Sequence, residues 1–337
     1  MAQAGRGVGV RMKKHLIVAV QIAFTLFLAA LFYPGRVEAS TIRYPDILYG
    51  TVGNVQLYLD VYVPSATGSA AVLWVHGGAW AKGDKNDAKV VSEATNLANE
   101  GFVVFSANYR LACTDPGNPL CGYTYDAPVL DLEAAMTWIR ANGAQPPYNA
   151  NVAKVGAWGN SAGGNLAGML GDTGALGGTK ADVIISPSGA NDLHDWGGPK
   201  AEEVRTDYIG CTYSLCPTTW QDASPLYHVD AAASPYWMSG GSLDDKVPPT
   251  DSLSMKEALD AVGVPNERHI VSGKCHALGC FDNDPSLWPS AVQFLHTYLP
   301  AGAGPSREYA APPTPLATSL DVYGSGTFER SGELFRS

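Results

Sequence analysis

The chain has little positive charge, and it lacks the cysteine patterns of metal-binding proteins. Its 337 residues include 22 lysines and arginines against 32 aspartates and glutamates, a formal net charge of −10. This acidic balance argues against binding nucleic acid through a basic surface. The six cysteines form no C-x-x-C pair and no clustered histidines accompany them, so we expect no zinc site. No repeat of about 20–50 residues appears either, and a repeat architecture is not indicated.

The first 39 residues have the pattern of a signal peptide. A basic start precedes an apolar run from Leu16 to Phe32, and Val37-Glu38-Ala39 then offers small residues to a signal peptidase. The segment holds no cysteine and no paired arginines, so neither lipid modification nor twin-arginine export is indicated. We predict cleavage, a secreted or periplasmic protein, and no stable membrane insertion. The alternative is an uncleaved anchor, because the run is near the lower limit for spanning a bilayer.

Removal of the predicted leader takes away five Lys/Arg and one Asp/Glu, which leaves 17 basic and 31 acidic residues. All six cysteines lie in the remaining chain, and an even number after a signal peptide favours disulfides. Proximity suggests the pairs Cys113–Cys121, Cys211–Cys216 and Cys275–Cys280, although six cysteines allow many other pairings. Each short loop would contribute about 2–3 kcal/mol in the chain-entropy model.

Strand and helix patterns alternate along most of the chain. Residues 55–63 alternate apolar and polar side chains, as a half-buried antiparallel strand does. Apolar runs typical of buried strands cover 70–75, 102–106, 152–158, 181–185, 235–239 and 268–271. Helical spacing covers 87–99, 129–139, 255–262 and 288–299. Such alternation predicts an α/β fold whose central sheet is mostly parallel, with helices on both faces.

Two stretches lack these signals. Residues 187–234 show little periodicity, and we expect them to pass over the top of the sheet. Residues 300–337 are rich in Pro, Gly and Ser and cannot bury much surface, so we predict a disordered tail. The predicted organisation is therefore a signal peptide at 1–39, one catalytic domain at 40–299 and a tail at 300–337.

One predicted strand runs into Gly159-Asn160-Ser161-Ala162-Gly163. A Gly-x-Ser-x-Gly pattern between a strand and a helix is typical of a nucleophile elbow, where a tight turn pushes the serine hydroxyl out above the sheet edge. Glycine at either side lets neighbouring chains approach closely. Ser161 is therefore the candidate nucleophile.

A serine nucleophile needs a base and a third group that holds the base. Among the histidines after Ser161, His276 follows the last predicted strand, whereas His269 lies inside that strand and His296 inside a helix. The acid should follow the preceding strand, where Asp244 and Asp245 stand side by side and either could orient His276.

The tetrahedral intermediate also needs backbone N–H groups that face its oxyanion. Ala162, directly after the nucleophile, offers one such group. His76-Gly77-Gly78 follows an earlier predicted strand, where the glycine amides can face the site unobstructed. Together, the glycines and the elbow predict an oxyanion hole formed by Gly77, Gly78 and Ala162.

With these residues identified, the chain resembles the α/β-hydrolase superfamily, in the branch of hormone-sensitive-lipase-like and bacterial feruloyl-esterase-like carboxylesterases. The matching stretches are Leu59–Pro64, His76–Trp80, Gly83–Lys85, Ala107–Leu111, Asp131, Gly159–Gly164, Gly210-Cys211, Ser224–Val229, Asp244–Pro248 and His276. The resemblance implies Ser161 as nucleophile, His276 as base and Asp244 as acid, with Gly77, Gly78 and Ala162 as oxyanion donors and His76 as a structural residue of the loop. Ala79 and Asn160 depart from the family pattern, which puts the shape of the acyl pocket in doubt.

The expected function is that of a secreted serine carboxylesterase acting on small carboxylic esters, with no metal or organic cofactor. No insertion large enough for a lipase lid is present, and acetylated or feruloylated plant carbohydrate is a substrate class by analogy alone. An amidase, formamidase or peptidase on the same apparatus is the alternative, and a non-catalytic binding module is a remote one. Because Cys275 and Cys280 bracket His276, we hypothesise that their disulfide stiffens the loop that carries the base.

Overall fold

A computed structural model describes residues 41–65, 68–172, 179–194, 199–299, 327–330 and 333–336. The chain divides into two units after Ala39, and the first of them, Met1–Ala39, lies wholly outside the described residues. The signal peptide and its cleavage therefore stay predictions. Within the described ranges, no helix has both the length and the apolar character needed to cross a membrane.

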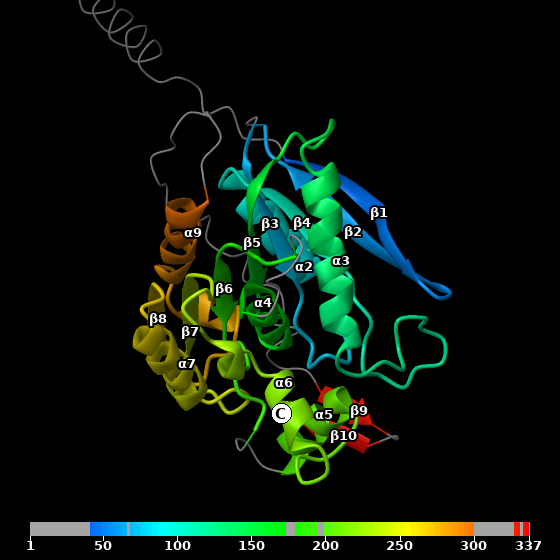
Figure 1. The fold of residues 1–337 in the computed structure, drawn as a ribbon, viewed down its shortest axis with the longest axis vertical. Coiled ribbons are helices and arrows are strands. Elements are labelled where there is room, and N and C mark those ends of the chain that lie inside the picture. The colour runs from blue at the N-terminus through cyan, green and yellow to red at the C-terminus, as the bar shows by residue number, and fades with distance from the viewer. Residues whose placement is uncertain are drawn as a thin grey trace, which may run out of the picture. The chain divides into compact units, whose positions relative to one another are not determined.

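An eight-stranded sheet forms the centre of the fold (Figure 1). In chain order, its strands are β1 (Ile42–Val52), β2 (Val55–Val63), β3 (Ala70–Val75), β4 (Val103–Ala107), β5 (Asn151–Gly159), β6 (Ile184–Pro187), β7 (Tyr236–Gly241) and β8 (Asn266–Val271). Their spatial order is β1-β2-β4-β3-β5-β6-β7-β8. The pairs β1–β2 and β2–β4 are antiparallel and all the others are parallel, so the predicted mostly parallel sheet is confirmed.

Helices cover both faces of this sheet. They are α2 (Ala88–Asn99), α3 (Ala127–Asn142), α4 (Ala162–Asp172), α5 (Pro199–Ile209), α6 (Pro217–Asp222), a 3-10 turn (Pro225–His228), α7 (Pro249–Val262), α8 (Gly279–Asn283) and α9 (Leu287–Tyr298). Apolar side chains of α3, α4 and α7 belong to one buried cluster, and those of α2, α8 and α9 belong to a second. The two clusters lie on opposite faces of the sheet, as the alternation along β3 shows.

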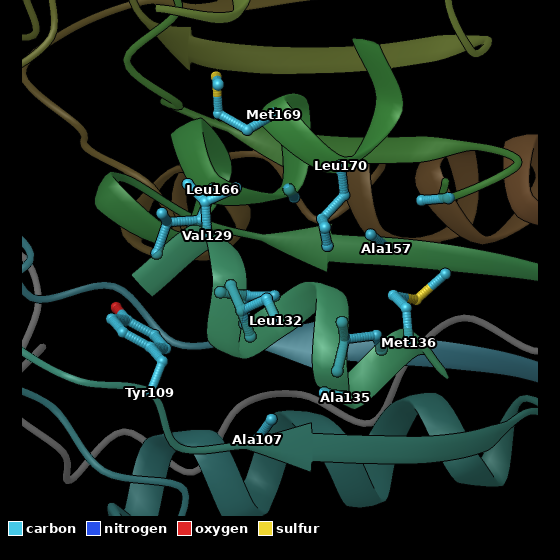
Figure 2. Close-up of a cluster of buried hydrophobic side chains, with 14 of the residues drawn as sticks. Ala107, Tyr109, Val129, Leu132, Ala135, Met136, Ala157, Leu166, Met169 and Leu170 are labelled. Carbon is cyan, nitrogen blue, oxygen red and sulfur yellow. The ribbon is translucent and has the colours of Figure 1, made fainter. Parts of the chain in front are cut away.

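Strand β3 separates the two clusters residue by residue. Ala71, Leu73 and Val75 join the cluster under α3 and α4, whereas Val72 and Trp74 join the one under α2 and α9. Successive side chains of a strand point to opposite faces, so a central strand with helices on both sides must be apolar at every position. Figure 2 shows the first cluster, where side chains of α3 and α4 meet between the helices and the strands.

Several features were not predicted, among them the short helix α8. Strand β1 pairs only with β2 at the edge and is largely exposed, so it lacks the alternation that marks a half-buried strand. The stretch 187–234 contains α5, α6 and the 3-10 turn. Their apolar residues pack on the rest of the fold but do not recur at helical spacing, so the sequence did not predict these helices. Strand β6 begins at Ile184 and ends at Pro187, later than the predicted run of 181–185.

The predicted tail lies largely outside the described residues. Within it, the backbone of β9 (Thr327–Arg330) pairs antiparallel with that of β10 (Glu333–Arg336). The prediction of a tail over 300–337 therefore stays a prediction.

All three predicted disulfides are present. The Cα–Cα distances are 4.7 Å for Cys113–Cys121, 6.3 Å for Cys211–Cys216 and 4.9 Å for Cys275–Cys280. The six cysteines all take part, so no free thiol remains among them. Proximity in sequence was sufficient because each pair lies within one loop or at one loop–helix junction.

Candidate active site

Ser161 occupies a sharp turn between β5 and α4. Its φ is 55°, a left-handed backbone conformation that is unfavourable for a residue with a side chain. The turn needs glycine around it: a Cβ at Gly159 would lie 2.0 Å from the carbonyl oxygen of Gly163, and one at Gly163 would lie 2.3 Å from that of Val75. The serine is only partly buried, and its N–H donates to the carbonyl of Pro187 at 3.0 Å. These contacts give the strand–turn–helix geometry of a nucleophile elbow.

The structure brings Ser161, His276 and Asp244 together in a continuous chain of hydrogen bonds. The Oγ of Ser161 lies 2.9 Å from Nε2 of His276, and Nδ1 of His276 lies 2.7 Å from Oδ2 of Asp244. The three residues follow β5, β8 and β7, respectively. The carboxyl ends of these parallel strands share one edge of the sheet, which is why residues 115 positions apart can meet.

Asp244 is buried beside His276 and held from its other side. Burial alone would raise the pKa of Asp244, but hydrogen bonds from His276 and from the N–H groups of Lys246 and Val247 outweigh burial and leave that pKa below its ordinary value. The carboxylate is therefore the stable form. Its neighbour Asp245 is exposed and pairs with Lys274 at 3.1 Å, so Asp244 is the carboxylate that faces His276.

The other histidines after Ser161 have separate surroundings. His269 lies in β8 and contacts Glu267 at 3.1 Å, and His296 stacks on Phe102. His194 stacks on Tyr213, and Nε2 of His228 contacts the carbonyl of Asp222.

The predicted oxyanion donors lie where β3 ends and α4 begins. Ala162 is the first residue of α4. Its N–H is therefore one of the first four in the helix, which have no carbonyl acceptor within that helix. A Cβ on Gly163 would also lie 2.5 Å from the carbonyl oxygen of His76, so the loop of Gly77 and Gly78 packs directly against the start of α4. In the described part of the chain, no backbone hydrogen bond uses the N–H groups of Gly77, Gly78 or Ala162. These are the three amides that the predicted oxyanion hole requires.

The side chain of His76 is buried and stabilises this loop. Its ring is buried and stacks on Tyr109, with centroids 4.3 Å apart, and burial lowers the pKa of the imidazole. Its Nδ1–H donates to the carbonyl of Gly77 at 2.8 Å, and the hydroxyl of Tyr109 donates to the carbonyl of His76 at 2.8 Å. A neutral, stacked imidazole of this kind fixes the backbone of the loop.

The far end of the same loop is anchored by Lys85. Its N–H donates to Oδ1 of Asn108 at 2.6 Å, and its buried ammonium pairs with Asp46 at 2.5 Å and Asp60 at 2.9 Å. In the sequence, Lys85 lies in one of the stretches that resemble the family, but its residue type predicts no role there. Nothing in the sequence shows that carboxylates of β1 and β2 meet this lysine.

Backbone strain gathers around the same site. Left-handed φ values occur at Ala79 (54°), Trp80 (57°), Ser161 (55°), Ser188 (45°) and Ala277 (51°). In the described chain, the only other non-glycine residues with such values are Asp46 and Asn149. Aspartate and asparagine adopt the left-handed region more readily than other residues with side chains. Strained residues of this kind persist where the surroundings hold them, and they are concentrated at functional sites.

Two further polar residues stand out. Asn160, which departs from the family pattern, is 1% exposed, and neither atom of its amide has a hydrogen-bond partner in the described residues. Ser188, which no sequence motif marks, contacts Asp244. No group of three or more His, Cys, Asp or Glu among the described residues is arranged to hold a metal ion.

Comparison with known proteins gives the same fold. The chain is 27% identical over 205 residues to the esterase LipC of Mycobacterium tuberculosis, a match that covers 57% of this chain and 48% of LipC. A carbohydrate esterase from gut microbiota superposes with a TM-score of 0.66 at 23% identity, covering 79% of this chain and 98% of that one. Propionate-bound esterase 2 of Thermogutta terrifontis gives a TM-score of 0.61 at 23% identity, covering 82% and 99%.

The chain spans about half the length of the first curated relatives it matches, from 48% to 59%. The sequence model of one family, BD-FAE, matches residues 59–259, which is more than half of the chain. That segment includes the glycine loop, the elbow and Asp244. The chain therefore belongs to the BD-FAE family and has the α/β-hydrolase fold.

Proposed function

We propose that the protein is a serine carboxylesterase that hydrolyses small carboxylic esters through an acyl-Ser161 intermediate. The observation that carries the proposal is the hydrogen-bonded chain from Ser161 through His276 to Asp244, at distances of 2.9 and 2.7 Å. Related proteins named esterase support the choice of an ester as substrate.

In the first half of the reaction, Oγ of Ser161 attacks the ester carbonyl carbon while Nε2 of His276 accepts the hydroxyl proton. Asp244 accepts the hydrogen bond from Nδ1 and stabilises the imidazolium that forms. The carbonyl oxygen becomes negative and is met by the N–H groups of Gly77, Gly78 and Ala162, whose positions are fixed before the reaction. When the tetrahedral intermediate collapses, the C–O bond to the alcohol breaks and His276 returns the proton to the leaving oxygen.

In the second half, water attacks the acyl group on Ser161. His276 accepts a proton from this water, the same amides stabilise the new oxyanion, and the ester bond to Ser161 breaks. The proton then returns to Oγ, and the carboxylic acid leaves. Each side chain therefore acts twice, and the enzyme ends as it began.

The substrate class within carboxylic esters follows by analogy. A gut carbohydrate esterase and a propionate-bound esterase are among the structural neighbours. They support short acyl groups, with acetylated carbohydrate as a natural source of them. Feruloylated carbohydrate, which carries a larger aromatic acyl group, is the other substrate class by analogy. The departures at Ala79 and Asn160 lie beside the oxyanion loop and the nucleophile, where the shape of the acyl site is set.

The test is a panel of p-nitrophenyl esters of graded acyl length. We expect the highest kcat/KM for short acyl chains, and a loss of at least about 1,000-fold in kcat for Ser161→Ala, since removal of a triad member leaves only binding and the oxyanion hole. Ser254→Ala, which changes an exposed serine of α7, is the control and should keep wild-type activity. Hydrolysis that survives in Ser161→Ala would overturn the proposal.

Amide hydrolysis on the same apparatus is the second candidate. Turnover of p-nitrophenyl acetate against that of the matching anilide separates the two, because the acyl group is identical and only the leaving group differs. A rate for the anilide comparable to that for the ester would favour an amidase or peptidase. No turnover of either, with an intact fold, would favour a binding module.

We also propose that the protein is exported and that its first 39 residues are removed. Three disulfides support an oxidising compartment. The intact mass of the protein recovered from the culture medium or periplasm, compared with that of the full chain, tests this proposal.

A further inference from the structure

Ser188 follows β6 directly, and its hydroxyl links the loops that carry the acid and the base. It donates to Oδ2 of Asp244 at 3.0 Å and accepts from the N–H of Ala277 at 2.8 Å. The directions are fixed by chemistry: the amide can only donate, and an ionised carboxylate can only accept. Oδ2 is also the oxygen that accepts from Nδ1 of His276, at 2.7 Å.

The backbone of Ser188 is strained in a way that glycine would avoid. Its φ is 45°, and its N–H is held by the carbonyl of Ser239 at 2.7 Å. Residues with side chains rarely adopt this region because Cβ crowds the carbonyl oxygen, and glycine adopts it freely. The residue is 5% exposed, so contact with water does not explain a serine here. The use of a serine in this position is explained by the two hydrogen bonds of its hydroxyl.

The two bonds act on different parts of the triad. The bond to Oδ2 fixes the rotation of the Asp244 carboxylate, because that oxygen now has two donors in fixed directions. The bond from Ala277 fixes the backbone directly after His276. The imidazole is therefore held both through its partner and through its own loop, with Nε2 directed at Ser161.

We propose that Ser188 is a positioning residue for ester hydrolysis, the fourth member of the hydrogen-bonded chain Ser161–His276–Asp244. The inference rests on the proposed function. Ser188 does not touch the reacting atoms; it holds the carboxylate and the base loop in the geometry that proton transfer needs.

Two variants and one matched control test the role. Ser188→Ala and Ser188→Gly both remove the hydroxyl, but only the glycine relieves the strain at φ 45°. Ser239→Ala is the control, because Ser239 is equally buried and its Oγ has no hydrogen-bond partner among the described residues. We expect kcat to fall about tenfold in both Ser188 variants, ~1.4 kcal/mol of barrier, with kcat/KM falling equally. Ser239→Ala should stay within about twofold of the wild-type kcat, because the Oγ of Ser239 makes no hydrogen bond to the described residues and so holds no member of the triad.

A spectroscopic measurement separates positioning from general support of the fold. We expect the proton between Nδ1 of His276 and Asp244, which are 2.7 Å apart, to give a far-downfield resonance in the proton NMR spectrum. This resonance should move in both Ser188 variants and stay unchanged in Ser239→Ala. Ser188→Gly should be the more stable of the two Ser188 variants while losing as much activity, so that stability and rate separate.

Wild-type kcat in both Ser188 variants, or an equal loss of kcat in Ser239→Ala, would overturn the inference. A raised KM at unchanged kcat would overturn it as well, since that pattern belongs to substrate binding. If Ser161→Ala remains active, the proposed function fails first. If Ser161→Ala is inactive and the Ser188 variants are unaffected, the triad stands and only the role of Ser188 is lost.

Discussion

The disulfide Cys275–Cys280 encloses the proposed base, and its removal should reduce activity as well as stability. The bridge closes a loop of sequence separation 5 that contains His276 and the strained Ala277. We consider the double variant Cys275→Ala/Cys280→Ala. Alanine avoids placing hydroxyls at two positions that are almost fully buried.

The magnitude follows from the loop length. In the chain-entropy model, a bridge across so short a loop stabilises the fold by about 2 kcal/mol. If all of that constraint were needed to keep His276 aligned, kcat would fall by at most about 30-fold. The loop is also held by the N–H of Ala277 on Ser188 and by Nδ1 of His276 on Asp244, so we expect a smaller fall, of about three- to tenfold.

The control has the same loop length. Cys211–Cys216 also has a sequence separation of 5, and neither cysteine is adjacent to a proposed catalytic residue. Cys211→Ala/Cys216→Ala should therefore lose the same ~2 kcal/mol of unfolding free energy in urea while keeping kcat. Hydrolysis of p-nitrophenyl acetate gives kcat for both. Equal kcat values in the two double variants, with equal losses of stability, would refute the idea that this bridge stiffens the base loop.

Two further changes are predicted. Gly163→Ala should lose about 3 kcal/mol of unfolding free energy in urea and most of its activity, because its Cβ would lie 2.3 Å from the carbonyl oxygen of Val75 and 2.5 Å from that of His76; a stable, active variant would contradict this packing. Burial raises the pKa of Asp251 to about 7, against hydrogen bonds from Asn191 that lower it, so its stabilising effect is complete below about pH 3.8 and is lost as the pH rises through 7. The difference in unfolding free energy between the wild type and Asp251→Asn should therefore shrink from pH 4 to pH 7.5, and a difference that grows would contradict the sign.

Chain order and residue type were sufficient to predict that a serine, a histidine and a carboxylate would meet at one edge of the sheet. Parallel strands end at one edge of a sheet, so residues that directly follow such strands lie near one another. This rule identified the glycine-flanked serine after a buried strand, the histidine after the last strand and the carboxylate after the strand that precedes the last one. Short-range spacing predicted the disulfides for a similar reason, since each pair is close in the sequence. The choice between Asp244 and Asp245 could not be made from the residues alone, because both precede the same helix and only packing decides which faces inward.

Contacts between distant segments escaped prediction. Ser188 lies 56 positions from Asp244 and 89 from Ala277, and the hydroxyl that links them resembles any other serine in the sequence. No role was predicted for Lys85, whose ammonium pairs with carboxylates from β1 and β2. Strand β1 carries no alternation because its position at the edge leaves both of its faces partly open to water.

The sequence by itself determined which chemical groups the chain offers and in which order they follow the strands and helices. This was possible because the hydrophobic period and the turn residues that specify a strand or a helix depend only on a few neighbouring residues. The tertiary structure decided which side chains meet, which of two adjacent carboxylates turns inward, and which ordinary serine becomes part of the hydrogen-bonded chain. Those outcomes depend on the register and twist of eight strands, and no short window of residues contains that information.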